Sequence, residues 1–134
     1  MAVQAVTRRV RMSSRKAGEV AALVRGRSVA EALVILQHTP RRAARPLLLT
    51  VKSAQANAEY NHSYKADSLK IVEISVTPGP ALKRYRPVAR GRALPFKRPS
   101  CHIRVVVDGP KRSPAKKPPA AKAIPAEGGA KEKK

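Results

Sequence analysis

The chain has 134 residues and a formal net charge of +21, from 29 Lys and Arg against eight Asp and Glu. A chain of this length forms one domain with at most a tail, and with only 3% aromatic residues its core must consist of Val, Leu, Ile and Ala. It has no apolar run of transmembrane length, no recognisable signal peptide and a single cysteine, which favours a cytosolic protein whose partner is nucleic acid, an anionic membrane or an acidic protein.

The first predicted element is an edge strand over residues 2–11, where Val and Thr alternate loosely with basic residues. A helix then follows the candidate N-cap residues Ser13 and Ser14, and Gly26 is placed to end it. The buried face of this helix is predicted to hold Ala17, Val20 and Val24.

A second, short helix is predicted by the Ser-x-x-Glu pattern from Ser28 to Glu31, which has the form of a capping box. Its apolar face is predicted to hold Val29, Leu33 and Leu36. Thr39-Pro40 then has the form of an N-cap followed by proline at the first helical position, so we expect a third helix over about residues 40–60.

The third helix carries an apolar stripe at helical spacing, formed by Leu47, Val51, Ala54 and Ala58. Pro46 lies inside it, removes one backbone hydrogen bond and is expected to bend the helix or delay its start. Residues 61–63 are expected to end it.

After Leu69 the apolar period changes to two, which predicts strands with one buried face. In the first run the predicted buried residues are Val72, Ile74 and Val76. In the second run they are Ile103, Val105 and Val107. We expect the two runs to pair antiparallel, which gives an α+β fold with three helices packed on a small antiparallel sheet.

The connection between these strands, about residues 78–100, is too long for an ordinary hairpin loop and contains no acid. It is predicted to project as a long extended β-hairpin, stiffened by Pro78, Pro80, Pro87, Pro95 and Pro99. Tyr85 and Phe96 either stack on nucleic-acid bases or anchor the two arms of the hairpin to each other.

The predicted organisation is a single domain over residues 1–110 and a basic Pro/Ala/Lys-rich tail over residues 111–134. The tail has almost nothing to bury and is expected to be disordered. The tail does not account for the whole positive net charge, because residues 1–108 hold 21 basic side chains against six acids.

An enzyme is not expected, because the acids and the three histidines are scattered without catalytic or metal-ligand spacing. His102 is interpreted as a hydrogen-bonded structural residue, and Cys101 as a small, partly buried side chain and not a nucleophile. No metal and no cofactor are predicted.

Nucleic-acid binding suits the excess of Arg, which pairs with phosphates in bidentate geometry and stacks on bases. Two clusters also have simpler interpretations. Arg8, Arg9 and Arg11 either bind nucleic acid or protect an edge strand from aggregation. The arginines of residues 41–45 either bind or form a solvated helix face.

Three stretches, in this order, carry a resemblance to a known family. They are VRMSSRKAGEVAALVRGRSVAEAL, the helix end KSAQANAEYN, and GPALKRYRPVARGRA followed by SCHIRVVV. Over about residues 5–107 the chain resembles the bacterial large-subunit ribosomal protein L-twenty-two family. The resemblance implies a body packed on large-subunit ribosomal RNA (rRNA) that assists its assembly. It also implies a hairpin that lines the nascent-peptide exit tunnel near its constriction and influences macrolide sensitivity.

The resemblance also implies particular contacts. The predicted rRNA-binding residues are Arg8, Arg9, Arg11, Ser13, Ser14, Arg15, Lys16, Arg25, Arg27, Lys83, Arg84, Lys97, Arg98 and His102. The predicted tunnel-lining tip is Arg86, Pro87, Val88, Ala89, Arg90, Gly91 and Arg92, with Gly91 allowing the turn. The implied partners are large-subunit rRNA, neighbouring large-subunit proteins and the nascent polypeptide; no membrane and no homo-oligomer are expected.

The chain departs from the family pattern at Val88, where the family usually has Arg, and in KRPSCH, where Lys97 and Arg98 come one position earlier relative to His102. The main alternative is an architectural DNA-binding protein that uses the basic hairpin as an arm. Such an arm needs an apolar wedge, for which Pro87 is the candidate. A cationic membrane-surface peptide is excluded because the chain has no Trp and only one Phe.

Overall fold

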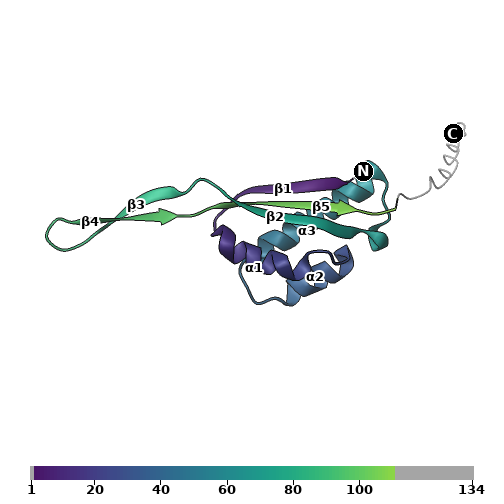
Figure 1. Cartoon of the computed structure of the whole chain (residues 1–134), viewed down its shortest axis with the longest axis horizontal. Coiled ribbons are helices and arrows are strands. Elements are labelled where there is room, and N and C mark those ends of the chain that lie inside the picture. The colour runs from purple at the N-terminus through teal and green to yellow at the C-terminus, as the bar shows by residue number, and fades with distance from the viewer. Residues whose placement is uncertain (1, 111–134) are drawn as a thin grey trace, which may run out of the picture.

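The structure is a computed structural model that describes residues 2–110, in which three helices and a three-stranded sheet form a body with a hairpin extending from one end (Figure 1). The helices are α1 (Ser14–Val24), α2 (Val29–His38) and α3 (Ala44–His62), followed by a 3-10 turn, η1 (Ala66–Ser68). The strands are β1 (Val3–Val10), β2 (Lys70–Pro78), β3 (Leu82–Pro87), β4 (Ala93–Arg98) and β5 (Cys101–Asp108). The predicted α+β class is confirmed, and the predicted tail lies outside the described residues.

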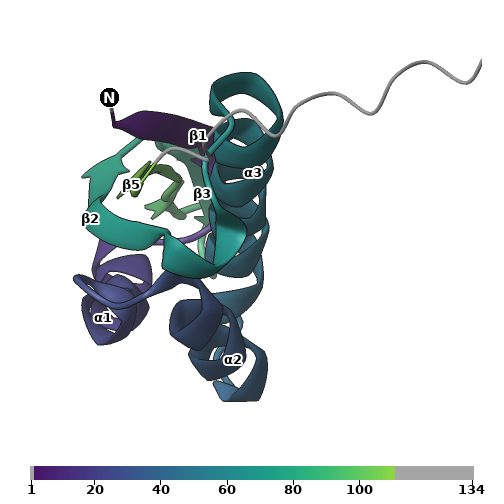
Figure 2. The same ribbon diagram turned by 90° about the vertical axis from the view of Figure 1, so that its right-hand side faces the viewer.

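The sheet of the body has the strand order β1-β5-β2, and both pairings are antiparallel, as predicted for β2 and β5. Viewed along the long axis in Figure 2, the helices gather on one side of the sheet. Alternation along β5 matches this arrangement, because Ile103, Val105 and Val107 are fully buried while Arg104 is exposed. The strand β1 lies at an edge, which confirms the prediction for residues 2–11.

Helix α3 supplies the centre of the core. All four residues of its predicted stripe are fully buried: Leu47, Val51, Ala54 and Ala58. The two alanines bring the helix backbone close to its neighbours, and α3 packs mainly against β1, β5 and α2. The helix ends at His62, as predicted, and Ser63 turns the chain with a left-handed φ of 54°.

The first two helices follow the sequence pattern closely. The apolar face of α1 is buried as predicted at Ala17, Val20 and Val24, and Gly26 follows the helix with φ +75°. At the start of α2 the Ser28 hydroxyl accepts a hydrogen bond from the Glu31 backbone N–H at 3.3 Å, which confirms the predicted N-cap. The buried face of α2 is Val29, Ala32 and Leu36, with Leu33 only partly buried.

The predicted start of the third helix was wrong. Thr39 is the C-cap of α2, and its hydroxyl donates to the Ile35 carbonyl at 2.6 Å, so it cannot cap the next helix. Helix α3 begins at Ala44, which places Pro46 in its first turn. Backbone N–H groups of a first turn have no partner within the helix, so proline is tolerated there. Pro46 therefore delays the helix, one of the two effects expected of it.

The prediction that Val72 is buried was also wrong. A β-bulge shifts the register of β2, so that Ile71 pairs with Val107 while Glu73 pairs with Val106. Because the bulge adds a residue, Ile71 and Ile74 face the core and Val72 is 59% exposed.

A second bulge lies in β1, between Thr7, which pairs with Ile103, and Val10, which pairs with Cys101. Within it Arg9 has a left-handed φ of 57°, and its backbone N–H donates to Nδ1 of His102 at 3.0 Å. This bond confirms that His102 is a hydrogen-bonded structural residue.

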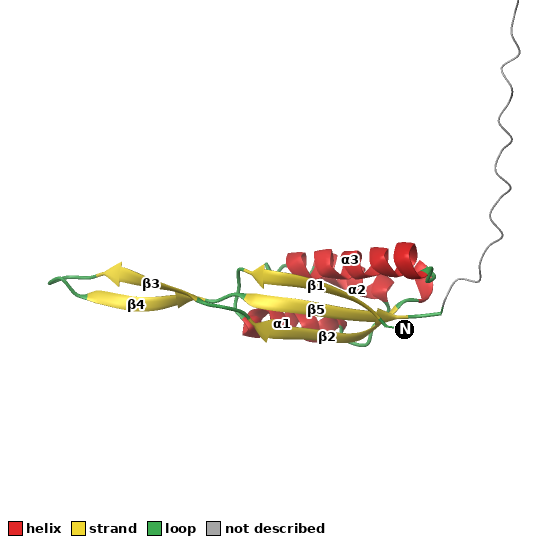
Figure 3. Cartoon of the chain, turned by 90° about the horizontal axis from the view of Figure 1, so that it is seen from above, coloured by secondary structure: helices red, strands yellow, loops and turns green. Residues whose placement is uncertain are grey.

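The connection over residues 78–100 forms a ribbon in which β3 pairs antiparallel with β4. Figure 3 shows it continuing outward from the end of the sheet where β2 ends and β5 begins. At its root the Gly79 N–H donates to the Ser100 carbonyl at 2.8 Å, and the Ser100 hydroxyl donates to the Pro80 carbonyl at 2.6 Å. A Cβ on Gly79 would lie 2.7 Å from the Ser100 hydroxyl, so the close approach at the root requires glycine.

Candidate nucleic-acid interface

A groove with a volume of about 780 Å³ lies where the hairpin joins the body, and we call it the basic groove. Four separate segments line it: the chain after β1, the first turns of α1, the turn before α3, and the end of β4 with the residue after it. Six of its lining side chains are basic: Arg11, Lys16, Arg41, Arg42, Lys97 and Arg98. The fold thus concentrates in one place charges that are up to 87 residues apart in the chain.

One acid, Glu19, also lines the groove, and its carboxylate accepts a hydrogen bond from the Arg41 guanidinium. Both side chains are more than half exposed, so this ion pair contributes little to stability. The other five basic side chains of the groove have no acid partner there, which leaves a strongly positive surface. Such a surface attracts a polyanion, because each bound phosphate releases condensed counterions.

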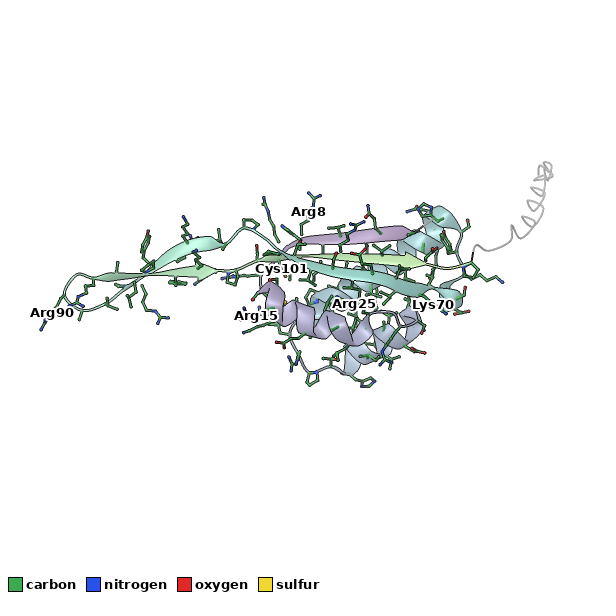
Figure 4. The ribbon with its side chains drawn as sticks, in the orientation of Figure 1. Arg8, Arg15, Arg25, Lys70, Arg90 and Cys101 are labelled. Atoms are coloured by element: carbon green, nitrogen blue, oxygen red, sulfur yellow. The ribbon has the colours of Figure 1, made fainter. Side chains whose placement is uncertain are left out.

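The start of α1 brings part of its predicted rRNA-binding motif to this groove, since Ser14 and Arg15 are not among the lining residues. Ser13 is the N-cap of α1, its hydroxyl makes no cap hydrogen bond, and the first turn contains no acid. Ser13 and Lys16 line the groove, and Arg15 projects from the same end of the body, near the hairpin (Figure 4). The start of α1 therefore adds a hydroxyl and the positive end of a helix dipole to the groove.

Sequence reasoning left Arg41, Arg42 and Arg45 open between nucleic-acid binding and a solvated helix face. The interpretation of these three as one helix face was wrong for Arg41 and Arg42, because both precede α3 and lie in the turn that lines the groove. Arg45 lines a smaller cavity that also contains Arg11 and Arg42. The available signal was the cluster of three arginines without an acid, next to a proline that interrupts the helix.

Arg25 and Arg27 are among the predicted rRNA-binding residues that do not line the groove. The Arg25 guanidinium donates to the Ile74 carbonyl at 3.1 Å, and Arg27 Nε donates to the Leu23 carbonyl at 3.0 Å. Figure 4 shows Arg25 farther along the body than Arg15. Arg25 is therefore hydrogen-bonded to the backbone of β2, and Arg27 to the backbone at the end of α1.

The hairpin has two different faces, since directly opposed residues of an antiparallel pair lie on the same face. One face, which we call the arginine face, carries Leu82, Arg84, Arg86, Leu94, Phe96 and Arg98. The other, which we call the lysine face, carries Lys83, Tyr85, Pro87, Ala93, Pro95 and Lys97. All twelve residues are exposed. The predicted contact residues Arg84 and Arg98 thus share one face, while Lys83 and Lys97 share the other.

Lys83 and Lys97 lie directly opposite each other in the ladder. Like charges in that position repel and destabilise the pair. A two-stranded ribbon is in any case marginally stable in water, and this one buries no side chain of its own. The ribbon is therefore suited to a partner that supplies negative charge and a surface to lie on.

The two aromatic residues of the ribbon are not paired with each other. Tyr85 pairs with Pro95, and Phe96 pairs with Arg84, so their rings lie on opposite faces. Tyr85 is 70% exposed, and Phe96 is covered in part by the Arg98 guanidinium, whose carbon lies 5.8 Å from the ring centroid. The two rings therefore do not anchor the arms through each other, and stacking on bases stays a prediction.

The tip of the hairpin is a tight turn in which the Val88 N–H donates to the Arg92 carbonyl at 2.9 Å. Arg90 and Gly91 both have left-handed φ angles, 59° and 69°, so Gly91 allows the turn as predicted. Arg90 lies at the far end of the molecule in Figure 4, where its charge is fully available to a partner.

The described part of the chain offers little for catalysis. Cys101 is buried in β5, and burial raises the pKa of its thiol, so the reactive thiolate is disfavoured. Among residues 2–110 no three His, Cys, Asp or Glu side chains are grouped so that they could hold a metal ion. Over the same residues no helix is long and apolar enough to cross a membrane.

Comparison with known proteins gives a consistent result. The family model described as ribosomal protein L22p/L17e matches residues 5–108. A large ribosomal subunit protein uL22 of Clostridioides difficile is 48% identical over 107 residues, which are 80% of this chain and 96% of that protein. The protein of the same name from Rippkaea orientalis is 45% identical over 105 residues, 78% of this chain and 88% of that protein. The matched region contains the basic groove and the whole hairpin.

Proposed function

This chain belongs to the ribosomal protein L22p/L17e family, and we propose that it binds large-subunit rRNA through the basic groove and lines the nascent-peptide exit tunnel with its hairpin. As a member of the family it is a structural constituent of the large ribosomal subunit and not an enzyme. It acts in the cytoplasm as part of the ribosome.

The observation that carries the RNA-binding proposal is the meeting of six basic side chains from four segments at one groove. A folded RNA presents phosphates at close spacing, and a groove with five basic side chains free of acid partners can neutralise several of them at once. Arg dominates the set, which suits RNA because guanidinium groups pair with phosphates and stack on bases.

The hairpin proposal rests on the charge and exposure of the ribbon. The ribbon contains no acid, presents all its strand residues to solvent and extends away from the body (Figure 3). When the ribbon lies against RNA, the phosphates neutralise the basic side chains of its lysine and arginine faces, which have no acidic partners in the ribbon. In this proposal the tip, Arg86 to Arg92, meets the nascent polypeptide near the constriction and influences macrolide sensitivity.

The body then acts as the anchor. It is held by its own core, so it can bind rRNA before the hairpin is in place and assist early folding of that RNA. Neighbouring large-subunit proteins contact the surfaces of the body that the rRNA leaves open.

Sedimentation of a cell lysate through a sucrose gradient at moderately high salt tests membership and RNA anchoring. We expect the protein to remain stoichiometric in the large-subunit peak. Release to the top of the gradient, or recovery with DNA, would favour an architectural DNA-binding protein instead.

A second experiment separates the anchor from the hairpin. Replacing Lys83, Arg84, Arg86, Arg90 and Arg92 with Ala removes five charges from the ribbon but none from the basic groove. We expect this variant to enter large subunits and to alter crosslinking between the tip and a nascent chain. Failure to enter subunits would show that the hairpin, and not the body, anchors the protein.

A further inference from the structure

A smaller cavity, with a volume of about 460 Å³, opens at the root of the hairpin, and we call it the root crevice. Its main lining residues are Arg9, Arg11, Arg98, Pro80, Leu82 and Pro99. Three of them, Arg11, Arg98 and Pro99, also line the basic groove, so the two cavities share a wall. A backbone that follows the groove would pass the opening of the crevice.

The lining of the root crevice combines two kinds of side chain. Three arginines stand beside apolar surface from two prolines and Leu82, and no acid is among its lining residues. A site for phosphate alone has no use for the apolar surface, and a site for an apolar ligand has no use for three guanidinium groups. A nucleotide needs both, because its base is a flat, largely apolar ring and its phosphates are anionic.

The bulge in β1 is what brings Arg9 to the crevice. In a regular strand Arg9 would follow the alternation of Ala5 and Thr7 and face the core. The extra residue of the bulge gives that inward position to Val10 and frees the Arg9 side chain. The hydrogen bond from the Arg9 N–H to His102 Nδ1 holds the bulge in place.

The opposite wall is also fixed before any ligand binds. The Ser100 hydroxyl donates to the carbonyl of Pro80, and the Ser100 carbonyl accepts from the Gly79 N–H. These bonds tie the two arms of the hairpin together at the crevice. Leu82, which begins β3, is 56% exposed and therefore has apolar surface available for a ligand.

We propose that the root crevice receives one unstacked base of the RNA whose backbone follows the basic groove. This inference rests on the proposed rRNA binding and adds a specific contact to it. The volume lies within the range of about 300–1,000 Å³ that is usual for small-ligand sites. The ligand is a bulged or loop nucleotide, since a base within a helix is held by its stack.

The test uses the full-length chain bound to large-subunit rRNA and two matched variants. Leu82→Trp places a bulky ring in the root crevice and leaves all three arginines unchanged. Leu94→Trp is the control, because Leu94 lies on the same face of the ribbon, is also 56% exposed and does not line the crevice. Base-specific chemical probing reports on single unpaired bases, and hydroxyl-radical probing reports on the RNA backbone.

We expect wild type and Leu94→Trp to protect one unpaired base that stays reactive with Leu82→Trp. The backbone footprint of the body should remain in all three proteins, which shows that the variant is folded and bound. Affinity should fall by about five- to 150-fold in Leu82→Trp, the range for loss of one stacked base. Leu82→Ala should give a smaller loss in the same direction.

Equal base protection and equal affinity in the two tryptophan variants would overturn the proposal while leaving rRNA binding intact. Loss of the backbone footprint in wild type would instead contradict the proposed function itself. An acidic peptide is the other ligand with suitable charge. A photocrosslinker attached at Pro99→Cys in assembled large subunits should react with rRNA, and transfer to a protein in place of RNA would overturn the proposal.

Discussion

The body and the hairpin are both antiparallel structures, yet they keep their shapes by different means. In the body the inward residues of β5 are fully buried beneath three helices. In the hairpin all strand residues are exposed and two lysines oppose each other. Apolar burial therefore stabilises the body on its own, whereas the ribbon buries no side chain and has two like charges that repel each other. A region with its own core is thus separated from a region that, under the proposed function, gains stability by binding.

The largest expected effect comes from the core of the body. Leu47→Ala removes a fully buried side chain, and unfolding in urea should show a loss of about 2–5 kcal/mol in the free energy of unfolding. Leu94→Ala in the hairpin is the matched control and should change it by no more than about 0.5 kcal/mol. Comparable losses in the two variants would mean that body and hairpin unfold as one unit.

The next effect concerns binding. Replacing Arg11, Arg42 and Lys97 with Ala removes three basic side chains of the groove, and Lys52, Lys65 and Lys70 are an equal number outside it. Measured as log affinity for rRNA against log salt concentration, the groove variant should have a slope shallower by about 2 to 3. The control variant has the same net charge and should keep a slope near that of wild type. If both slopes fall alike, binding follows total charge and not the groove.

A smaller effect is expected where the two regions join. Gly79→Ala places a Cβ against the Ser100 hydroxyl and the His102 ring, so the root must shift. Relative to wild type we expect about 1–3 kcal/mol of destabilisation in thermal unfolding. Adding Ser100→Ala removes the shortest contact and should recover part of this loss. A fully stable Gly79→Ala would show that the root is not rigid.

The smallest expected effects come from two serines at helix starts, one of which should affect stability and the other rRNA affinity. Ser28→Ala removes a cap hydrogen bond and should cost about 1 kcal/mol in the free energy of unfolding, with rRNA affinity unchanged. Ser13→Ala removes a hydroxyl that makes no cap bond but lines the groove, so it should weaken rRNA binding more than stability. Reversal of this pattern would argue against a contact to RNA at the start of α1.

Local patterns were enough to predict most of the body. The stripe from Leu47 to Ala58 and the alternation from Ile103 to Val107 are set by neighbours in the chain, and both are buried as predicted. The bulge at Val72 was not predictable in this way, because a bulge depends on pairing with a strand more than 30 residues away. The same reason explains the start of α3, where Thr39 bonds backward to α2.

The candidate interface was likewise predictable from the sequence only in part. The basic hairpin and the motif at the start of α1 stand out in the sequence through their uniform charge and their resemblance to a family. The basic groove does not, because Arg42, Lys16 and Lys97 come together only in the folded chain. His102 was predicted both as a structural residue and as an rRNA contact. In the folded chain its Nδ1 accepts a hydrogen bond from the Arg9 N–H, so this nitrogen has a partner within the protein.

The strand order β1-β5-β2 also has a consequence for synthesis. Among the strands of residues 2–110 the central one is made last, so β1 and β2 have no partner in the sheet until residues 101–108 have left the ribosome that makes them. Pairings between distant segments form slowly, and unpaired strand edges favour aggregation. A chain that stops before Cys101 would have its helices and most of its charge but no sheet to pack them on. Newly made copies are therefore most in need of protection, by RNA or a chaperone, until β5 has emerged.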